Sequence, residues 1–272
     1  MLTFQFVKDF IRMCEIGDRL GFHERNGGNA SYHLLPEEAK SAKKRLAKKK
    51  AGPWVDIGTS VPELGGDLFL VTGSGKFMRN VAYDPEVNIC LAELNAEGTQ
   101  YRIRWGLSKG GRPTSEFPTH LMNHEVKTRL TGGAYRVIYH AHPPQLIALT
   151  FVLPLRDRDF TRALWNTMTE CPVIFPEGIG VVKWMVPGGR DIAVETSKLM
   201  AKYNNVIWAH HGLFCAADSF DNAMGQMETI EKAAHIYNIV HSMVPKPRQG
   251  ITSEGYLAIA RDFHLEISKR FL

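Results

Sequence analysis

The sequence of 272 residues has few cysteines and no long hydrophobic run. Its four cysteines are scattered along the chain, and no two of them form a CxxC pair. Such usage is typical of reduced, buried thiols, so we expect neither disulfides nor a structural zinc knuckle. No apolar stretch approaches the roughly 20 residues of a membrane span, and the first residues lack the basic region and uncharged apolar core of a secretory signal. We therefore expect a cytoplasmic protein that does not contact membranes.

An excess of positive charge is found in only one segment. Residues 37–50 contain seven basic and two acidic residues, which account for the whole net charge of +5. No aromatic residue is interleaved with them, so a nucleic-acid-binding surface is not expected. We interpret this segment as a solvated helix or mobile loop, with attraction of a phosphate group as the alternative. The composition as a whole, 44% hydrophobic and 22% charged, is that of an ordinary globular domain.

Two apolar segments end in histidine. The first, Val137–His142, is rich in β-branched and aromatic residues and is followed by two prolines, which predicts a buried strand. Side chains alternate between the faces of a strand, so His140 and His142 would lie about 7 Å apart on one face, near enough to share a metal ion. The second segment, Val206–Gly212, would supply a third ligand. Three histidines with an open coordination position favour a catalytic metal, whereas core histidines bonded to carbonyl groups are the alternative.

Two glycine-rich turns offer backbone amides to an anion. Arg25–Asn29 places two glycines between asparagines, and Thr72–Lys76 follows the apolar strand Leu68–Val71. Successive amides in such turns can form a concave anion-binding nest. The second turn matches neither the Walker A nor the dinucleotide-binding pattern, which leaves the phosphate of a small metabolite as its candidate ligand. For the first turn, a plain turn is an equal alternative.

A third anion-binding feature is the expected start of a helix. Thr114 or Ser115 would cap this helix, and Glu116 would lie in its first turn. Anions bind at helix N-termini because the backbone N–H groups there are free and the helix dipole is positive. His120 and His124 are four residues apart, but no HExxH glutamate accompanies them, so we interpret them as helix surface or core.

The remaining segments predict alternating helices and strands. We expect helices at 3–20, 145–152, 160–169 and 191–202, a long helix capped by Asp218 or Ser219 and reaching Met243, and a last helix from Ser253. We expect strands at 30–34, 173–175, 180–184 and 213–216, and an antiparallel hairpin of 89–94 and 100–105. Glu170 precedes the expected strand 173–175, a position where a lone glutamate is ordinarily a solvated loop residue. No linker divides the chain.

Seven motifs in this order make the sequence resemble the class II aldolase and epimerase family. They are RNGGN at 25–29, VTGSGKF at 71–77, PTSEFPTH at 113–120, HAH at 140–142, MTEC at 168–171, WMVPG at 184–188 and HHG at 210–212. The resemblance covers about residues 25 to 243 and implies one α/β domain over residues 1–272. Its central sheet would be mixed but largely antiparallel, with helices on both faces. A homotetramer with sites at the subunit interfaces is also implied.

The resemblance assigns roles to individual residues. The implied ligands of one Zn²⁺ per subunit are His140, His142 and His211, although three imidazoles also accept cobalt, nickel or manganese. The implied acid/base residue is Glu116, and the second carboxyl is Glu170, which would act near the aldehyde in its own or a neighbouring subunit's site. The implied ligands of the substrate phosphate are Asn26, Gly28, Asn29, Ser74, Gly75, Thr114 and Ser115. His210 has no role in the pattern.

The implied reaction is retro-aldol cleavage of a ketose 1-phosphate. The expected substrate is L-rhamnulose 1-phosphate, which would give dihydroxyacetone phosphate and L-lactaldehyde in L-rhamnose breakdown. Alternatives are another ketose 1-phosphate, such as L-fuculose 1-phosphate, and 4-epimerisation of a pentulose phosphate, which needs a different acid/base pair. The family pattern does not explain the lysine-rich segment, and Pro143 and Pro144 after HAH resemble the broader family as much as its rhamnulose-cleaving members. Both points bear on sugar specificity more than on reaction type. A non-catalytic scaffold of the same fold would not need the metal ligands and Glu116, so it is disfavoured.

Overall fold

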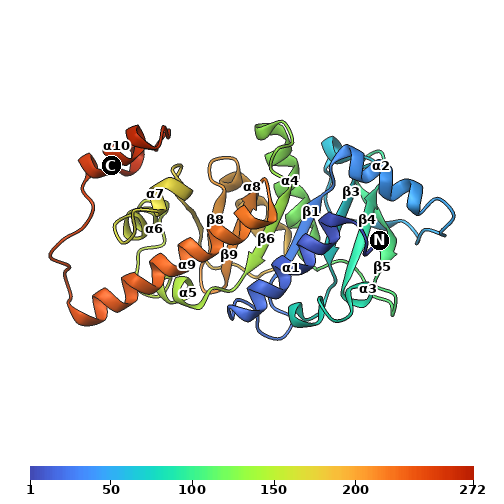
Figure 1. The fold of residues 1–272 in the computed structure, drawn as a ribbon, viewed down its shortest axis with the longest axis horizontal. Coiled ribbons are helices and arrows are strands. Elements are labelled where there is room, and N and C mark those ends of the chain that lie inside the picture. The colour runs from blue at the N-terminus through green and yellow to red at the C-terminus, as the bar shows by residue number, and fades with distance from the viewer.

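A nine-stranded sheet forms the centre of the molecule (Figure 1). The computed structural model describes all of residues 1–272. The strands, in sheet order, are β2 (Val55–Asp56), β5 (Gln100–Gly106), β4 (Ile89–Leu94), β3 (Leu68–Thr72), β1 (Asn29–His33), β6 (Val137–Ala141), β9 (Gly212–Ala217), β8 (Asn205–Trp208) and β7 (Gly180–Val182). Every neighbouring pair is antiparallel except β7 and β8, which are parallel. The expected mixed, largely antiparallel sheet is confirmed.

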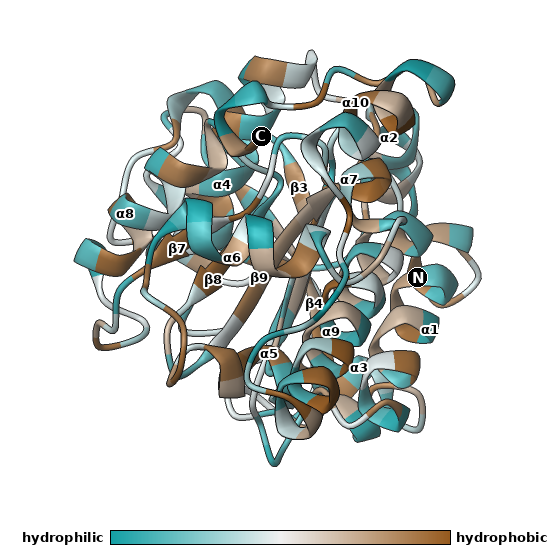
Figure 2. Ribbon diagram, turned by 90° about the vertical axis from the view of Figure 1, so that its left-hand side faces the viewer, coloured by the Kyte–Doolittle hydropathy of each residue, from teal (hydrophilic) through white to brown (hydrophobic).

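Helices cover both faces of this sheet, as expected. They are α1 (Gln5–Arg19), α2 (Pro36–Arg45), α3 (Pro85–Asn88), α4 (Phe117–Thr131), α5 (Pro144–Leu149), α6 (Asp157–Trp165), α7 (Cys171–Ile174), α8 (Arg190–Met200), α9 (Phe220–Met243) and α10 (Ser253–Asp262). Helices α1 and α9 pack on one face, and α4 and α8 pack on the other. Figure 2 shows the strands mainly in brown between helices that carry both colours. No helix is long and apolar enough to cross a membrane.

The alternation of side chains along the strands decides which residues reach each helical layer. In β6, Val137 and Tyr139 enter the core under α1 and α9, whereas Ile138 enters the core under α8. His140, two residues beyond Ile138, therefore lies on the α4 and α8 face. In β1, Ala30 and Tyr32 belong to the α1 and α9 core, which leaves the polar residues between them to face α4. The polar side of β1 thus lies under α4.

Two local predictions were wrong. Residues 173–175 do not form a strand, because Cys171–Ile174 form the four-residue helix α7, with Pro172 in its first turn. Proline at that position has a φ angle suited to a helix start, and this outweighs the β propensity of the next residues. The expected cap of α4 is also absent. Glu116 itself precedes the helix, and no side chain caps its first N–H groups.

Other local predictions are confirmed. The lysine-rich segment begins as the helix α2, in which Ala42 is buried and the lysines lie at the surface. Ser219 caps the long helix α9 by accepting a hydrogen bond from the N–H of Asn222. His120 and His124 lie in the core on α4. All four cysteines are buried and free.

Candidate active site

Three histidines converge where β6 ends. His140 is the fourth residue of β6, His142 follows the strand, and His211 lies in the tight turn between β8 and β9. These segments meet because β6 pairs with β9, with Ala141 opposite Leu213. One ring nitrogen of each histidine lies within 4.8 Å of one ring nitrogen of the others. The structure therefore brings together the three histidines that the sequence predicted as metal ligands.

Two of these histidines present a buried nitrogen that has no hydrogen-bond partner. The Nδ1–H of His140 donates to the carbonyl oxygen of Leu213 at 3.1 Å, and Nδ1 of His142 contacts the Glu24 carboxylate at 2.8 and 3.0 Å. These contacts place the protons on Nδ1, so the Nε2 lone pairs are free. Both Nε2 atoms are buried without a partner. Buried polar atoms are rarely left unpaired, so this donor set fits a divalent metal.

His140 and His211 are also neutral, as metal ligands must be. Burial lowers the pKa of His211 to about 4, and burial also holds the pKa of His140 well below its usual value. In both cases the neighbouring His142 adds to the effect. At neutral pH these two lone pairs are available without the loss of a proton.

The turn that carries His211 depends on its two neighbours. His210 has a left-handed backbone with φ of 59°, and its N–H donates to the Thr150 hydroxyl at 3.0 Å. A Cβ atom at Gly212 would lie only 2.2 Å from the carbonyl oxygen of Ala141. Only glycine therefore permits the close approach of β9 to β6 that brings His211 to the other two histidines.

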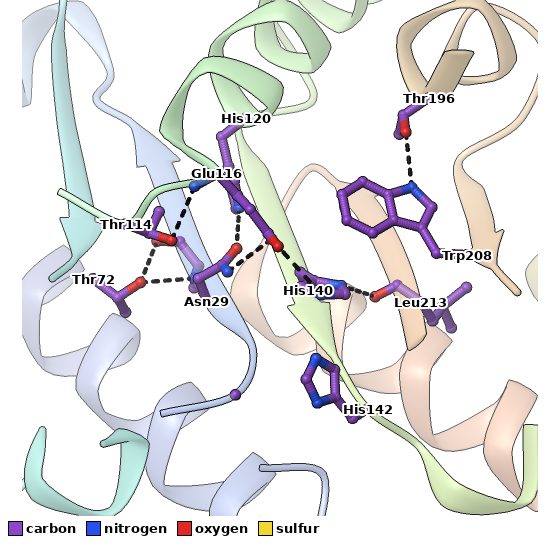
Figure 3. A network of polar contacts seen from close by, with 12 residues as sticks. Asn29, Thr72, Thr114, Glu116, His120, His140, His142, Thr196, Trp208 and Leu213 are labelled. Carbon is purple, nitrogen blue, oxygen red and sulfur yellow. Dashed lines mark hydrogen bonds and ion pairs between the residues drawn. The ribbon is translucent and has the colours of Figure 1, made fainter. Parts of the chain in front are cut away.

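Aromatic side chains hold the His140 ring in place. Phe214 stacks on it, with ring centroids 4.2 Å apart and an interplanar angle of 12°. Trp208 packs against both His140 and His211, and its Nε1–H donates to the Thr196 hydroxyl at 2.8 Å (Figure 3). This packing fixes the orientation of the His140 ring within the nitrogen cluster.

Glu116 lies beside the histidine cluster at the start of α4. Its Oε2 is 3.7 Å from Nε2 of His140 and accepts a hydrogen bond from Nδ2 of Asn29 at 2.9 Å (Figure 3). Burial raises the pKa of Glu116 to about 7, although the Asn29 hydrogen bond opposes this shift. A carboxyl group that titrates near neutral pH can both accept and release a proton, as an acid/base catalyst must.

One polar cavity of about 190 Å³ connects these groups with the predicted phosphate ligands. Its lining residues are Asn26, Gly27, Gly28, Asn29, Gly73, Ser74, Gly75, Thr114, Ser115, Glu116, His142, Pro187 and His211. All seven residues predicted to bind phosphate are among them. No lysine or arginine lines the cavity, so an anion there would be held by amide and hydroxyl groups. The side chain of Asn29 uses one Nδ2–H for Glu116 and its Oδ1 for His120, which leaves one N–H of its amide.

Glu170 is the one predicted site residue that the structure leaves apart. It precedes α7, it is exposed to solvent, and it does not line the cavity. Helix α7 packs against α9 and α10. Within one chain, Glu170 and Glu116 therefore do not share a site.

Sequence reasoning missed Glu24, which contacts His142. It also missed His23, which contacts the glycine-rich turn at 25–29. The ring of His23 bonds the Tyr139 hydroxyl at 2.7 Å and the carbonyl oxygen of Gly27 at 3.0 Å. Both residues immediately precede the RNGGN motif, which was the available signal. Their partners lie far away in sequence, so only the fold shows the contacts.

Comparisons with known proteins agree with this geometry. A family model described as "Class II Aldolase and Adducin N-terminal domain" matches residues 8–238. The rhamnulose-1-phosphate aldolases of Yersinia pestis (strain Pestoides F) and Yersinia pseudotuberculosis serotype O:3 (strain YPIII) are both 41% identical over 97% of this chain and 95% of theirs.

Solved structures have the same fold. A sugar-phosphate aldolase from Thermotoga maritima has a TM-score of 0.74 and 28% identity, over 89% of this chain and 97% of its own. The L-fuculose 1-phosphate aldolase from Glaciozyma antarctica PI12 has a TM-score of 0.61 over 94% of this chain and 81% of its own. At 15% identity, the second likeness concerns the fold alone.

Proposed function

The chain belongs to the class II aldolase family, and we propose that it cleaves L-rhamnulose 1-phosphate to dihydroxyacetone phosphate and L-lactaldehyde with one zinc ion per subunit. The observation that carries this proposal is the single cavity, which joins a histidine cluster, a buried glutamate and a set of neutral anion-binding groups. The choice of sugar is supported by the 41% identity to relatives named rhamnulose-1-phosphate aldolase.

The three clustered histidines would hold the zinc ion, because their free nitrogens have the number and spacing for it. Three protein ligands leave a coordination position open. A bound zinc ion supplies a Lewis acid that stabilises developing negative charge by several kcal/mol. No lysine lines the cavity, so a Schiff base with the substrate carbonyl cannot form there.

The reaction breaks the bond between C3 and C4 of the sugar. The C4 hydroxyl loses its proton and becomes the aldehyde group of lactaldehyde, and the electron pair of the broken bond stays with the dihydroxyacetone phosphate half. In the proposal, Glu116 delivers the proton that C3 then needs. Its burial and its pKa of about 7 suit that task. Proton transfer by such a group typically accelerates a reaction by a factor of about 10² to 10⁴.

We assign the C4 hydroxyl proton to Glu170, acting directly or through a water molecule. Since Glu170 does not line the cavity of its own chain, this role requires it to enter the site of a neighbouring subunit. A homotetramer with sites at its interfaces would meet that requirement. The exposed apolar side chains of Trp184 and Val186, next to the cavity residue Pro187, are surface that such an interface would cover.

The substrate phosphate would lie against the two glycine-rich turns and the start of α4. Gly28 and Gly75 have positive φ angles of 72° and 70°, so their backbones can adopt the turns that aim amides at an anion. The hydroxyl groups of Ser74, Thr114 and Ser115 would add donors. These contacts would orient the sugar between the histidine cluster and Glu116, which is their contribution to catalysis.

The test is to add L-rhamnulose 1-phosphate to the purified protein and to follow dihydroxyacetone phosphate with a coupled reductase. We expect release that a chelator abolishes and zinc restores. Restoration by cobalt, nickel or manganese but not by zinc would reject the assigned metal. No release from the zinc-loaded protein would reject this substrate, and release from L-fuculose 1-phosphate would then identify a different ketose-1-phosphate aldolase.

A further inference from the structure

A buried chain of hydrogen bonds runs from Glu116 into the core. Asn29 donates from Nδ2 to Oε2 of Glu116 at 2.9 Å, and its Oδ1 bonds Nε2 of His120 (Figure 3). The Ser31 hydroxyl lies 2.7 Å from Nδ1 of His120 and 2.7 Å from Nε2 of His124. All five residues are buried. The three residues beyond Asn29 do not line the cavity.

The chain is possible because a strand and a helix present polar residues at matching intervals. Asn29 and Ser31 are two residues apart on β1, a rise of about 6.6 Å. Glu116, His120 and His124 are four residues apart along α4, a rise of about 6 Å per step. Residues from the two elements therefore alternate, and each polar side chain meets the next one on the opposite element.

The direction of these hydrogen bonds follows from the number of donors. The Ser31 hydroxyl has one proton but two histidine nitrogens beside it, so it must donate to one and accept from the other. If His124 donates from Nε2, Ser31 donates to Nδ1 of His120. The proton of neutral His120 is then on Nε2, where it donates to Oδ1 of Asn29. Asn29 is left with Nδ2 facing Glu116, as observed.

The opposite direction leaves two groups in conflict. It would place the proton of His124 on Nδ1, which is buried and has no partner. It would also turn Oδ1 of Asn29 toward Glu116, so that two acceptors would face each other whenever Glu116 is ionised. A buried donor without a partner is unfavourable, because folding removes it from water and gives it no hydrogen bond in return. Both histidines are neutral in either case, because burial lowers the pKa of His120 to about 3 and that of His124 well below its usual value.

We propose that His124, Ser31 and His120 are positioning residues that form a one-way hydrogen-bond chain, which orients the Asn29 amide and thereby holds Glu116 where it exchanges its proton with the substrate. The inference rests on the proposed function in that it assumes Glu116 to be the acid/base group. The chain orients Glu116 and does not supply protons to it, because the Asn29 amide has no proton that it can readily give up at neutral pH.

The matched pair Ser31→Thr and Ser31→Val tests the proposal. The two replacements have nearly the same shape and packing in the buried site, and only threonine keeps the hydroxyl. We expect Ser31→Thr to keep a kcat close to that of the parent protein and Ser31→Val to lose about 10- to 100-fold in kcat, as when supporting contacts of a site are removed. Zinc content and KM should be equal in the two variants. Equal kcat values would overturn the proposal.

A second measurement does not depend on activity. ¹⁵N-histidine NMR of the parent protein shows which ring nitrogen carries each proton, and the His120→Asn and His124→Asn variants assign the signals. We expect both rings to be protonated at Nε2 in the parent protein. A proton on Nδ1 of either ring would overturn the proposed direction.

The two measurements separate this proposal from the proposed function. If the zinc-loaded parent protein cleaves no ketose 1-phosphate, the proposed function fails, and the NMR result still decides the direction of the chain. If the parent protein is active but Ser31→Val and Ser31→Thr cleave equally fast, the function stands and the positioning role is rejected.

Discussion

Two groups of histidines lie on the same face of the sheet, and they differ in what their nitrogens meet. In the first group, His140, His142 and His211, the nitrogens nearest one another lie within 4.8 Å, and two of them are buried without a partner. In the second group, Ser31 separates His120 from His124 and bonds both of them. Only the first group has free nitrogens that converge on one point.

This difference distinguishes the proposed metal-binding histidines of the first group from the structural ones of the second. Burial does not, because His120, His124 and His140 are all fully buried. Spacing in the sequence is also insufficient, since histidines four apart on a helix can bind zinc as well. The deciding feature is the partner of the inward nitrogen. A hydroxyl group occupies that position in the second group, and no protein group occupies it in the first.

Glu116 lies beside His140 of the first group and is linked to the second group through Asn29, so its replacement should give the largest effect. Glu116→Gln keeps the size of the side chain and an oxygen that can accept from Asn29, but it removes the group that exchanges a proton. We expect kcat to fall by about 10² to 10⁴ while zinc content stays unchanged. The control is Glu125→Gln on the same helix, outside the cavity. Parent-like cleavage by Glu116→Gln would reject the assigned role.

Zinc should stabilise the protein through the first group alone. At free zinc 1,000-fold above its Kd, we expect the free energy of unfolding of the parent protein to rise by about 4 kcal/mol over the chelated protein. His142→Ala should lose most of this increment, because one ligand is gone, whereas Ser31→Val should keep it. Urea unfolding with zinc and with chelator measures both. If zinc raised the free energy of unfolding of His142→Ala as much as that of the parent protein, the proposed ligand set would be contradicted.

In the metal-free protein, the second group, His120 and His124, should make the free energy of unfolding depend on pH. Burial lowers the pKa of His120 to about 3 and also lowers that of His124, whereas in the unfolded chain both are near 6.5. Between these values the unfolded chain binds more protons, so stability falls as the pH falls below 6.5. Each histidine contributes up to about 1.4 kcal/mol per pH unit.

The His124→Gln variant tests this pH dependence. Its side-chain amide can still donate to Ser31, but it cannot titrate, so stability should fall less steeply between pH 6.5 and 5 than in the parent protein. His235→Gln, at an exposed position on α9, is the control and should leave the parent slope unchanged. Urea unfolding in chelator at several pH values gives the slopes. A slope for His124→Gln equal to that of the parent would show that His124 does not resist protonation in the folded protein.

The sequence predicted features that depend on neighbouring residues, and it missed features that depend on residues far apart in the chain. The histidine cluster and the glycine-rich turns were predicted because each depends on a short motif at the end of a strand. The α7 helix was missed because a single proline outweighed the β propensity of its neighbours. The contact of Glu24 with His142 and the chain through Ser31 join residues about 90 to 120 positions apart. Such contacts leave no pattern in one sequence.

Glu24 gives the smallest expected effect and the sharpest test of the comparison, because it reaches the first group only through His142. Its carboxylate lies 2.8 Å from Nδ1 of His142 and fixes the proton there, but it is 68% exposed, so water screens part of the interaction. We expect Glu24→Gln to weaken zinc binding about tenfold, at the low end for such contacts, because the amide oxygen can still accept the hydrogen bond. Glu24→Ala, which keeps no acceptor, should bind zinc more weakly still. Competition with a zinc-sensitive dye measures both affinities, and saturating zinc should restore cleavage in both variants. A loss of cleavage that zinc does not restore would show that Glu24 acts on the reaction itself and not through the metal ligand.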